Sequence, residues 1–305
     1  MATDSRTVVV ATLFRKRRSY PVVPMKEQVN IDQRVAAGFG DEWTRFDQSG
    51  LQESVRAEIF DAYFRCFPWG QLPAEAVGAD FGCGSGRWAA LVAPRVGTLY
   101  CIDASAAALE VARRNLGSFT NCELVLASVA DTPIADGSLD FGYSLGVLHH
   151  VPDTAAGLAA CVRKLKPGAP FLLYLYYRFD NRPGWYRAAW SIANLTRTVV
   201  SRLPYGLRYW GSQLLAAGVY WPAARVARLA HRLGIEAPHL PLQFYADKPF
   251  YVMRTDALDR FGTRLEQRFT RLEIARMMQA AGLRGIQFSE QAPFWCAVGL
   301  RGGAE

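Results

Sequence analysis

A glycine-rich stretch, VGADFGCGSGRWAAL at residues 77–91, restricts the fold of this chain more than any other feature. An apolar run leads to Asp80, after which Gly82, Gly84 and Gly86 alternate with other residues. Glycine adopts positive φ readily, and without a Cβ it lets a ligand approach the backbone closely. A packed core does not need three glycines in this spacing, so we expect a strand, a sharp ligand-binding turn and then a helix.

Strand-like and helix-like segments alternate around this turn, which is typical of a parallel sheet wrapped by helices. The expected strands are residues 76–81, 98–103, 122–128, 139–146, 171–177, 284–290 and 294–300. The expected helices are residues 51–67, 85–93, 104–116, 153–165 with Asp153 as N-cap, and 270–281 ended by Gly282. The pattern predicts an α/β fold with a doubly wound, mostly parallel sheet.

The second expected strand, TLYCID, ends in Asp103, seventeen residues after Gly86. A carboxylate in that place accepts hydrogen bonds from both hydroxyls of a ribose, so the glycine loop and Asp103 together describe a nucleoside site. Two interpretations fit these residues. Gly84–Ala89 matches the G-x-G-x-x-[GA] pattern of dinucleotide-binding loops, which favours a nicotinamide-dependent oxidoreductase. Asp80–Gly86 also has the form D-x-G-x-G-x-G.

At this second pattern the sequence resembles the class I S-adenosylmethionine-dependent methyltransferases. The acidic end of the second strand and the motifs LHHVPD and LKPG share the resemblance, which covers residues 76–177 and, more weakly, 268 to the end. The run from TPIADG to LYLYY, residues 132–177, is similar to the UbiE-like small-molecule group. The resemblance implies a Rossmann-like methyltransferase with S-adenosyl-L-methionine as cofactor. A non-catalytic cofactor-binding protein is the remaining alternative.

The resemblance also implies roles for the loop residues. Asp80, Gly82, Gly84 and Gly86 would lie against the methionine part of the cofactor, with Asp80 near its amino group. Asp103 would hold the ribose.

Four further residues would complete the cofactor site. Ala104 would pack on the adenine, and Leu145 would lie beneath the methyl donor. Ser128 and Val129 fall where the family has an acidic residue, which accepts from the adenine N6 amine, and its neighbour. A serine hydroxyl accepts this hydrogen bond less strongly than a carboxylate.

His149 and His150 follow the fourth strand, at the rim where an acceptor would lie. Imidazole titrates near neutrality, so either histidine suits a general base for an oxygen or carbon acid. The alternative is a structural role, with one ring near the cofactor and the other bonded to the following turn. The sequence does not separate O- from C-methylation, and it lacks the NPPY-type run that accompanies methylation of amide or base nitrogens.

Four segments are expected along the chain. They are an N-terminal arm and helical cap at 1–75, with the arm over 1–25, a cofactor-binding core at 76–177, a helical lid insert at 178–268, and the last helix and closing strands at 269–305. In the cap, Phe39 and Trp43 either close over the cofactor or anchor the helices on the sheet. In the insert, an apolar stripe of Trp185, Ala189, Ile192, Val199 and Leu203 is expected to pack inward.

The insert also carries the positive charge of the chain. Between residues 174 and 232 there are nine arginines, no lysine and one acidic residue, against a net charge of +8 for the whole chain. This composition suits an acidic or amphiphilic acceptor, contact with an anionic membrane face, or a homo-oligomer formed through the aromatic surface. Nucleic acid is unlikely because no recognised binding motif accompanies the charge.

The remaining composition excludes several other classes. No apolar run approaches the roughly 20 residues of a membrane span, and the N-terminal charges follow the apolar stretch, unlike a secretory signal, so we expect a cytoplasmic protein. The six cysteines are scattered without metal-ligand spacing, which predicts free thiols and no metal site.

Overall fold

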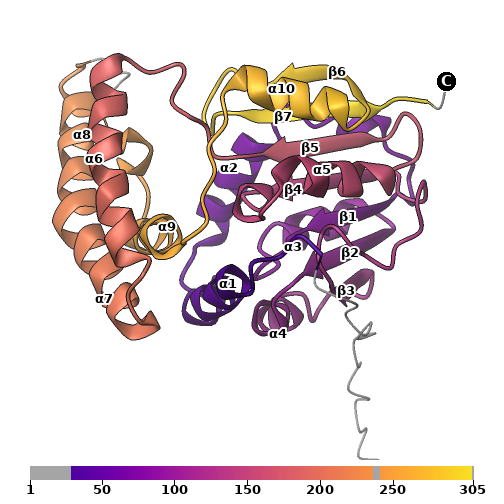
Figure 1. Ribbon diagram of the computed structural model, residues 1–305, viewed down its shortest axis with the longest axis horizontal. Coiled ribbons are helices and arrows are strands. Elements are labelled where there is room, and N and C mark those ends of the chain that lie inside the picture. The colour runs from indigo at the N-terminus through magenta and orange to yellow at the C-terminus, as the bar shows by residue number, and fades with distance from the viewer. Residues whose placement is uncertain (1–28, 236–240, 304–305) are drawn as a thin grey trace, which may run out of the picture.

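The computed structural model describes residues 29–235 and 241–303, and a seven-stranded sheet with helices on both faces forms its centre (Figure 1). The strands are β1 (Val77–Phe81), β2 (Thr98–Asp103), β3 (Cys122–Leu126), β4 (Phe141–Leu145), β5 (Pro170–Tyr174), β6 (Leu283–Phe288) and β7 (Cys296–Arg301). Their order in the sheet is β3-β2-β1-β4-β5-β7-β6. Strands β1 to β5 pair in parallel, whereas β7 is antiparallel to β5 and to β6. The doubly wound, mostly parallel sheet is thus confirmed, and the expected arm at 1–25 lies outside the described residues.

Two apolar cores, one on each face of the sheet, hold the flanking helices. One face is covered by α2 (Glu53–Phe64), α3 (Ala89–Val92) and α4 (Ala106–Asn115), and the other by α5 (Thr154–Arg163) and α10 (Arg271–Ala280). The N-cap of α5 is Asp153, as predicted, and its Oδ1 accepts from the backbone N–H of Ala156 at 2.9 Å. N-terminal to these, α1 (Gln33–Arg45) packs on α4.

The helix that follows the glycine loop, α3, begins later in the sequence than expected. Gly82, Gly84 and Gly86 have φ of +90°, +53° and +74°, so the backbone is not helical along the loop. The helix expected from Ser85 therefore begins only at Ala89. The predicted start was wrong because the same three glycines that open the loop to a ligand exclude helical φ and ψ.

A group of helices lies between β5 and α10 in the sequence, and Figure 1 shows it beside the sheet rather than on either face. Its members are α6 (Gly184–Val200), α7 (Tyr205–Leu215), α8 (Trp221–Arg232) and α9 (Phe250–Gly262), with a π-helical turn, η4 (Ala216–Tyr220), joining α7 to α8. Helix α9 contacts α1, α6 and α7, and it links this group to the rest of the chain. No helix of the described residues is long and apolar enough to cross a membrane.

The orientation of α6 is the opposite of the one expected. Ile192 is 72% exposed, and Trp185 and Val199 are exposed as well, so the prediction that this stripe packs inward was wrong. The polar side of α6 faces α9, where the Nη1 of Arg197 donates to the carbonyl of Thr263 at 3.0 Å. The last carbonyls of a helix lack intrahelical partners and carry partial negative charge, so they attract cations.

Candidate functional site

A cavity of about 530 Å³ opens at the carboxyl ends of β1, β2, β4 and β5. Its walls come from the glycine loop, the ends of these strands, α1, α2, α9 and the start of α6. This is where open parallel sheets bind ligands, because the strand order reverses there and the loops on either side diverge. Phe39 and Trp43 of α1 lie in the wall.

The backbone of the glycine loop forms one side of the cavity. Gly82 and Gly84 line it, and a Cβ on Gly84 would lie 2.7 Å from Nε1 of Trp43. A Cβ on Gly82 would lie 2.4 Å from Val147. Glycine is therefore required at both positions by the positive φ and by the packing.

Asp103, at the end of β2, holds the loop and faces the same cavity. Its Oδ2 accepts from the backbone N–H of Gly84 at 2.9 Å and its Oδ1 from that of Ser105 at 2.8 Å. Burial raises the pKa of Asp103, and these backbone hydrogen bonds oppose the rise. A carboxylate fixed in this way is preorganised to accept further hydrogen bonds from a ligand.

Four other predicted residues also lie in the cavity wall. Ala104, Ser128, Val129 and Leu145 line it together with the loop. The hydroxyl of Ser128 donates to the carbonyl of Val29 at 2.9 Å and accepts from the backbone N–H of Ala130 at 3.1 Å. Ser128 therefore already has a hydrogen-bond acceptor within the chain.

Three predicted residues do not line the cavity: Asp80, Gly86 and His149. Asp80 is buried and accepts from the hydroxyl of Tyr143 at 3.0 Å, and burial raises its pKa to about 8. The ring of His149 stacks on Tyr176 with centroids 3.9 Å apart, and burial lowers its pKa well below the usual value.

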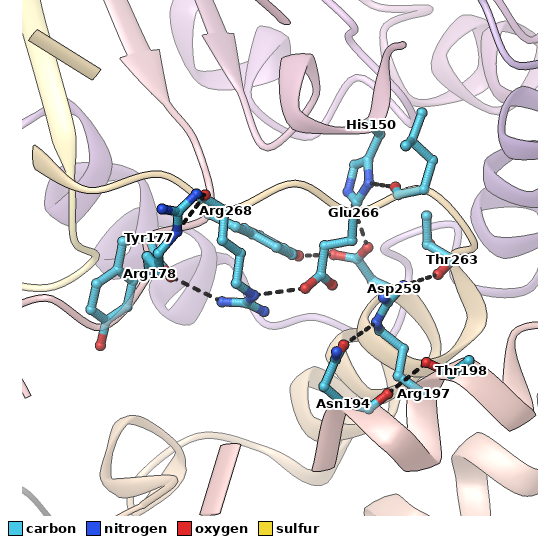
Figure 2. A network of polar contacts seen from close by, with 12 residues as sticks. His150, Tyr177, Arg178, Asn194, Arg197, Thr198, Asp259, Thr263, Glu266 and Arg268 are labelled. Carbon is cyan, nitrogen blue, oxygen red and sulfur yellow. Dashed lines mark hydrogen bonds and ion pairs between the residues drawn. The ribbon is translucent and has the colours of Figure 1, made fainter. Parts of the chain in front are cut away.

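His150 does reach the cavity, and its surroundings fix its tautomer (Figure 2). Its Nδ1 is 2.7 Å from the carbonyl of Leu265, which can only accept, so Nδ1 carries the proton. The unprotonated Nε2 then faces Oδ1 of Asp259 at 3.7 Å. Burial lowers the pKa of His150 to about 4, so the ring is neutral at pH 7.

Acidic residues of α1 and α9 in the cavity wall were not found from the sequence. Asp259 accepts from the hydroxyl of Tyr176, and Asp256 accepts from that of Tyr245 at 2.8 Å. Burial raises the pKa of both aspartates to about 6, and that of Glu42 well above its usual value. The sequence feature that could have indicated them is the i, i+3 spacing of Asp256 and Asp259, which places both on one side of a helix.

Arginine side chains neutralise part of this acidic wall. Arg268 pairs with Glu266 at 2.7 Å and donates to the carbonyl of Tyr177 at 3.2 Å, as Figure 2 shows. Its guanidinium also lies 5.0 Å from the ring centroid of Tyr176 and 4.8 Å from that of Trp190. The wall thus joins rings, acids and a guanidinium in a largely buried space.

Taken together, the sheet, glycine loop and strand-end carboxylate define a Rossmann-like protein with a nucleoside-type cofactor site. Comparison with known proteins then gives the family. Residues 79–173 match the family described as "Methyltransferase domain". Residues 79–173 are therefore a methyltransferase domain, in agreement with the resemblance to the class I S-adenosylmethionine-dependent methyltransferases.

Two curated relatives and one solved structure illustrate the similarity. The chain is 31% identical over 166 residues to a ubiquinone biosynthesis O-methyltransferase of Thiobacillus denitrificans, covering 53% of this chain and 65% of that one. It is 35% identical over 136 residues to an uncharacterized 37.1 kDa protein in transposon TN4556 of Streptomyces fradiae, covering 44% and 36%. The chain thus spans less than two thirds of either relative. An O-methyltransferase family protein from Burkholderia thailandensis shares the fold, with a TM-score of 0.50, 15% identity, and coverage of 90% of this chain and 61% of that one.

Proposed function

We propose that this protein transfers the methyl group of S-adenosyl-L-methionine to a small-molecule acceptor and releases S-adenosylhomocysteine. One observation carries the proposal: the glycine loop and Asp103 line the same cavity as a set of aromatic rings and the acidic residues of α9. A cofactor held by the first would present its methyl group toward the second. The methyltransferase family of residues 79–173 supports the same assignment.

On the cofactor side, each residue has a separate task. The backbone of Gly82 and Gly84 meets the methionine part, and Asp103 accepts from the ribose hydroxyls. Ala104 and Val129 enclose the adenine. Ser128, Asp80 and Gly86 support this site: Ser128 offers its second lone pair, and the other two fix the loop from behind.

On the acceptor side, the wall suits a planar or aromatic molecule with an ionisable hydroxyl or carbon acid. Tyr176 and Phe179 are among the rings that line the cavity, and Arg182 offers a partner for an acidic group of the acceptor. The helical insert would cover the acceptor as a lid, because Tyr186 of α6 belongs to the same wall. In this proposal the segment 76–177 supplies the cofactor side together with His150 and Tyr176 of the acceptor side, and the segment 178–268 supplies the rest of the acceptor side.

Methyl transfer requires an in-line displacement with the acceptor deprotonated. The acceptor atom forms a bond to the methyl carbon while the carbon–sulfur bond breaks and its electron pair returns to sulfur. We assign the departing proton to Asp259, whose pKa of about 6 makes it the stronger base of the pair with His150. His150 stands beside it with a free Nε2, and His149 positions Tyr176 by stacking.

Isothermal titration calorimetry tests the cofactor assignment without knowledge of the acceptor. Purified protein is titrated in parallel with S-adenosylmethionine, S-adenosylhomocysteine and NADH. We expect micromolar or tighter binding of the two sulfur nucleosides and none of NADH. Binding of NADH alone would favour the oxidoreductase and overturn the proposal.

A pair of variants ties the binding to the site. Asp103→Asn keeps the size of the side chain but removes its charge, and we expect S-adenosylmethionine affinity to fall at least about tenfold. Asp136→Asn is the matched control, because Asp136 is exposed, lies outside the cavity wall and pairs with Lys164 and Arg163. Equal affinities of the two variants would contradict the ribose assignment.

A further inference from the structure

The outward sides of α6, α7 and α8 are apolar, which is unusual for helices at the surface of a protein. On α6, Ile192, Leu195 and Val199 recur at helical spacing and all are exposed. The opposite side of α6 carries polar residues: Asn194 accepts from Arg197, and Arg197 donates to the carbonyls that follow α9. A surface helix normally has the reverse arrangement, with its polar side toward water.

Helix α7 has the same inverted arrangement. Trp210 and Leu214 are 65% and 72% exposed. Ser212 and Gln213 are buried, and Nε of Arg254 on α9 donates to Oε1 of Gln213 at 2.6 Å. The side chains that water would solvate best therefore face the interior, and the apolar ones face outward.

Helix α8 completes the surface. Trp221, Val226 and Leu229 are exposed, whereas the small residues Ala224 and Ala227 are buried. Figure 1 shows α6, α7 and α8 together at one end of the molecule, beyond α9. We call their outward sides the apolar helix face.

The charged side chains that residues 181–235 contribute to these helices all have one sign. Residues 181–235 contain eight arginines and no acidic residue. Arg187, Arg202 and Arg232 are exposed and belong to the same stretch as the exposed apolar side chains. Asp247, which pairs with Arg228 at 3.1 Å, follows this stretch in the sequence.

We propose that the apolar helix face binds the surface of an anionic lipid bilayer. Exposed Trp and Leu side chains would enter the boundary between headgroups and acyl chains, where the amphipathic indole ring is favoured. The exposed arginines, Arg187, Arg202 and Arg232, would meet lipid phosphates, which arginine binds in a bidentate manner. The helices would lie in the plane of the membrane surface, which agrees with the absence of any described helix long enough to cross it.

Charge complementarity favours a lipid surface over a second copy of the chain. In a symmetric dimer, the same face of both copies would meet, so arginines would oppose arginines without acidic partners from residues 181–235. An anionic bilayer supplies the missing negative charge, and it accommodates apolar side chains without a shaped pocket.

Vesicle flotation with the full-length protein tests this proposal. The probes are phosphatidylcholine vesicles and vesicles in which about one quarter of the lipid is phosphatidylglycerol. We expect the protein to float with the anionic vesicles, to bind the neutral ones much more weakly, and to lose most binding in about 0.5 M NaCl. Absence of binding to the anionic vesicles, or equal binding to both, would overturn the proposal.

Matched variants separate the apolar and the charged contributions. Ile192→Gln with Leu214→Gln removes two exposed apolar side chains, and we expect at least about tenfold weaker binding. Leu272→Gln on α10 is the control, because Leu272 is also exposed but lies outside the apolar helix face. Because both apolar substitutions are at exposed positions, the unfolding temperature should stay close to that of the wild type.

The charge variants are Arg187→Gln with Arg232→Gln, which we expect to weaken anionic binding about thirtyfold. Their control, Arg114→Gln with Arg276→Gln, lowers the net charge equally on exposed positions elsewhere. Equal weakening by the two pairs would mean attraction by net charge alone and would overturn the docking surface. Light scattering that shows a dimer, made monomeric by Ile192→Gln with Leu214→Gln, would assign the face to a second copy instead.

Discussion

Substituting Asp259 by asparagine should make the protein more stable, and the gain should depend on pH. Burial raises the pKa of Asp259 in the folded protein to about 6, from an ordinary value of 3.8. The folded state therefore binds the proton more tightly than the unfolded state, and ionising the carboxyl group costs stability. The cost grows as the pH rises from about 4 to 6 and is then constant, because the carboxyl group is ionised in both states.

The size of the effect follows from the pKa difference. About two pKa units, at about 1.4 kcal/mol each, correspond to about 3 kcal/mol at pH 8. The side chain of Asp259 is 23% exposed, so water solvates part of the carboxylate and reduces this cost. We therefore expect Asp259→Asn to raise the free energy of unfolding by about 2 kcal/mol. Asparagine keeps an oxygen for the hydroxyl of Tyr176 and offers an N–H toward the free Nε2 of His150, so no polar atom loses its partner.

Thermal unfolding of both proteins between pH 4 and pH 8 measures the gain. A chain of this size shifts by about 2 °C per kcal/mol, so Asp259→Asn should unfold roughly 4 °C higher at pH 8 and at nearly the same temperature at pH 4. Asp136→Asn is the control of opposite sign, because a hydrogen bond from Lys164 lowers the pKa of Asp136. A loss of stability in Asp259→Asn, or a gain that does not change with pH, would refute the reasoning. With an acceptor in hand, the same variant should lose about 10²-fold or more in kcat.

Three further substitutions test the site and the fold. Gly84→Ala combines a positive φ of +53° with a Cβ 2.7 Å from the indole of Trp43, so S-adenosylmethionine binding measured by calorimetry should weaken at least about tenfold; wild-type affinity would mean that the loop does not meet the cofactor. Gly78→Ala puts a Cβ 2.1 Å from the ring of Phe141, so unfolding in urea should show a loss of about 1–3 kcal/mol or more, and an unchanged midpoint would contradict this packing. Asp153→Ala removes the N-cap of α5 and should cost about 1 kcal/mol in the same assay while leaving cofactor affinity intact; a fall in affinity would show that the cap also supports the site.

The sheet and the cofactor side of the cavity could be predicted because local chemistry determines them. Strands that are buried on both faces appear in the sequence as continuous apolar runs, and a sharp turn with several positive φ angles favours glycine. Asp103 was found because it is the last residue of β2, so its position along the sequence also gives its position in space. The start of α3 was misplaced only because the loop extends through Trp88.

The acceptor side could not be predicted in the same way, because it depends on how distant segments meet. Asp259 lies more than a hundred residues after His150, yet the two side chains face one another. Nothing in the sequence near either residue indicates this contact. His149 and His150 are adjacent in the sequence, but only His150 lines the cavity, whereas the ring of His149 is buried against Tyr176.

The arginines of the insert explain why its orientation was predicted wrongly. Arg197 and Arg208 donate to carbonyls at the end of α9, and Arg228 donates to the carbonyl of Ala246, so a large part of the positive charge is bound to backbone inside the molecule. A sequence pattern shows that a helix has a polar and an apolar side, but not which side finds the better partner. Here the polar side of α6 binds the carbonyls at the end of α9, so the apolar side of α6 faces outward. The inward arginines and the proposed membrane surface therefore have one cause. Arginine side chains of α6 and α7, rather than water, bind the carbonyls at the C-terminal end of α9, and this leaves the apolar sides of both helices facing outward.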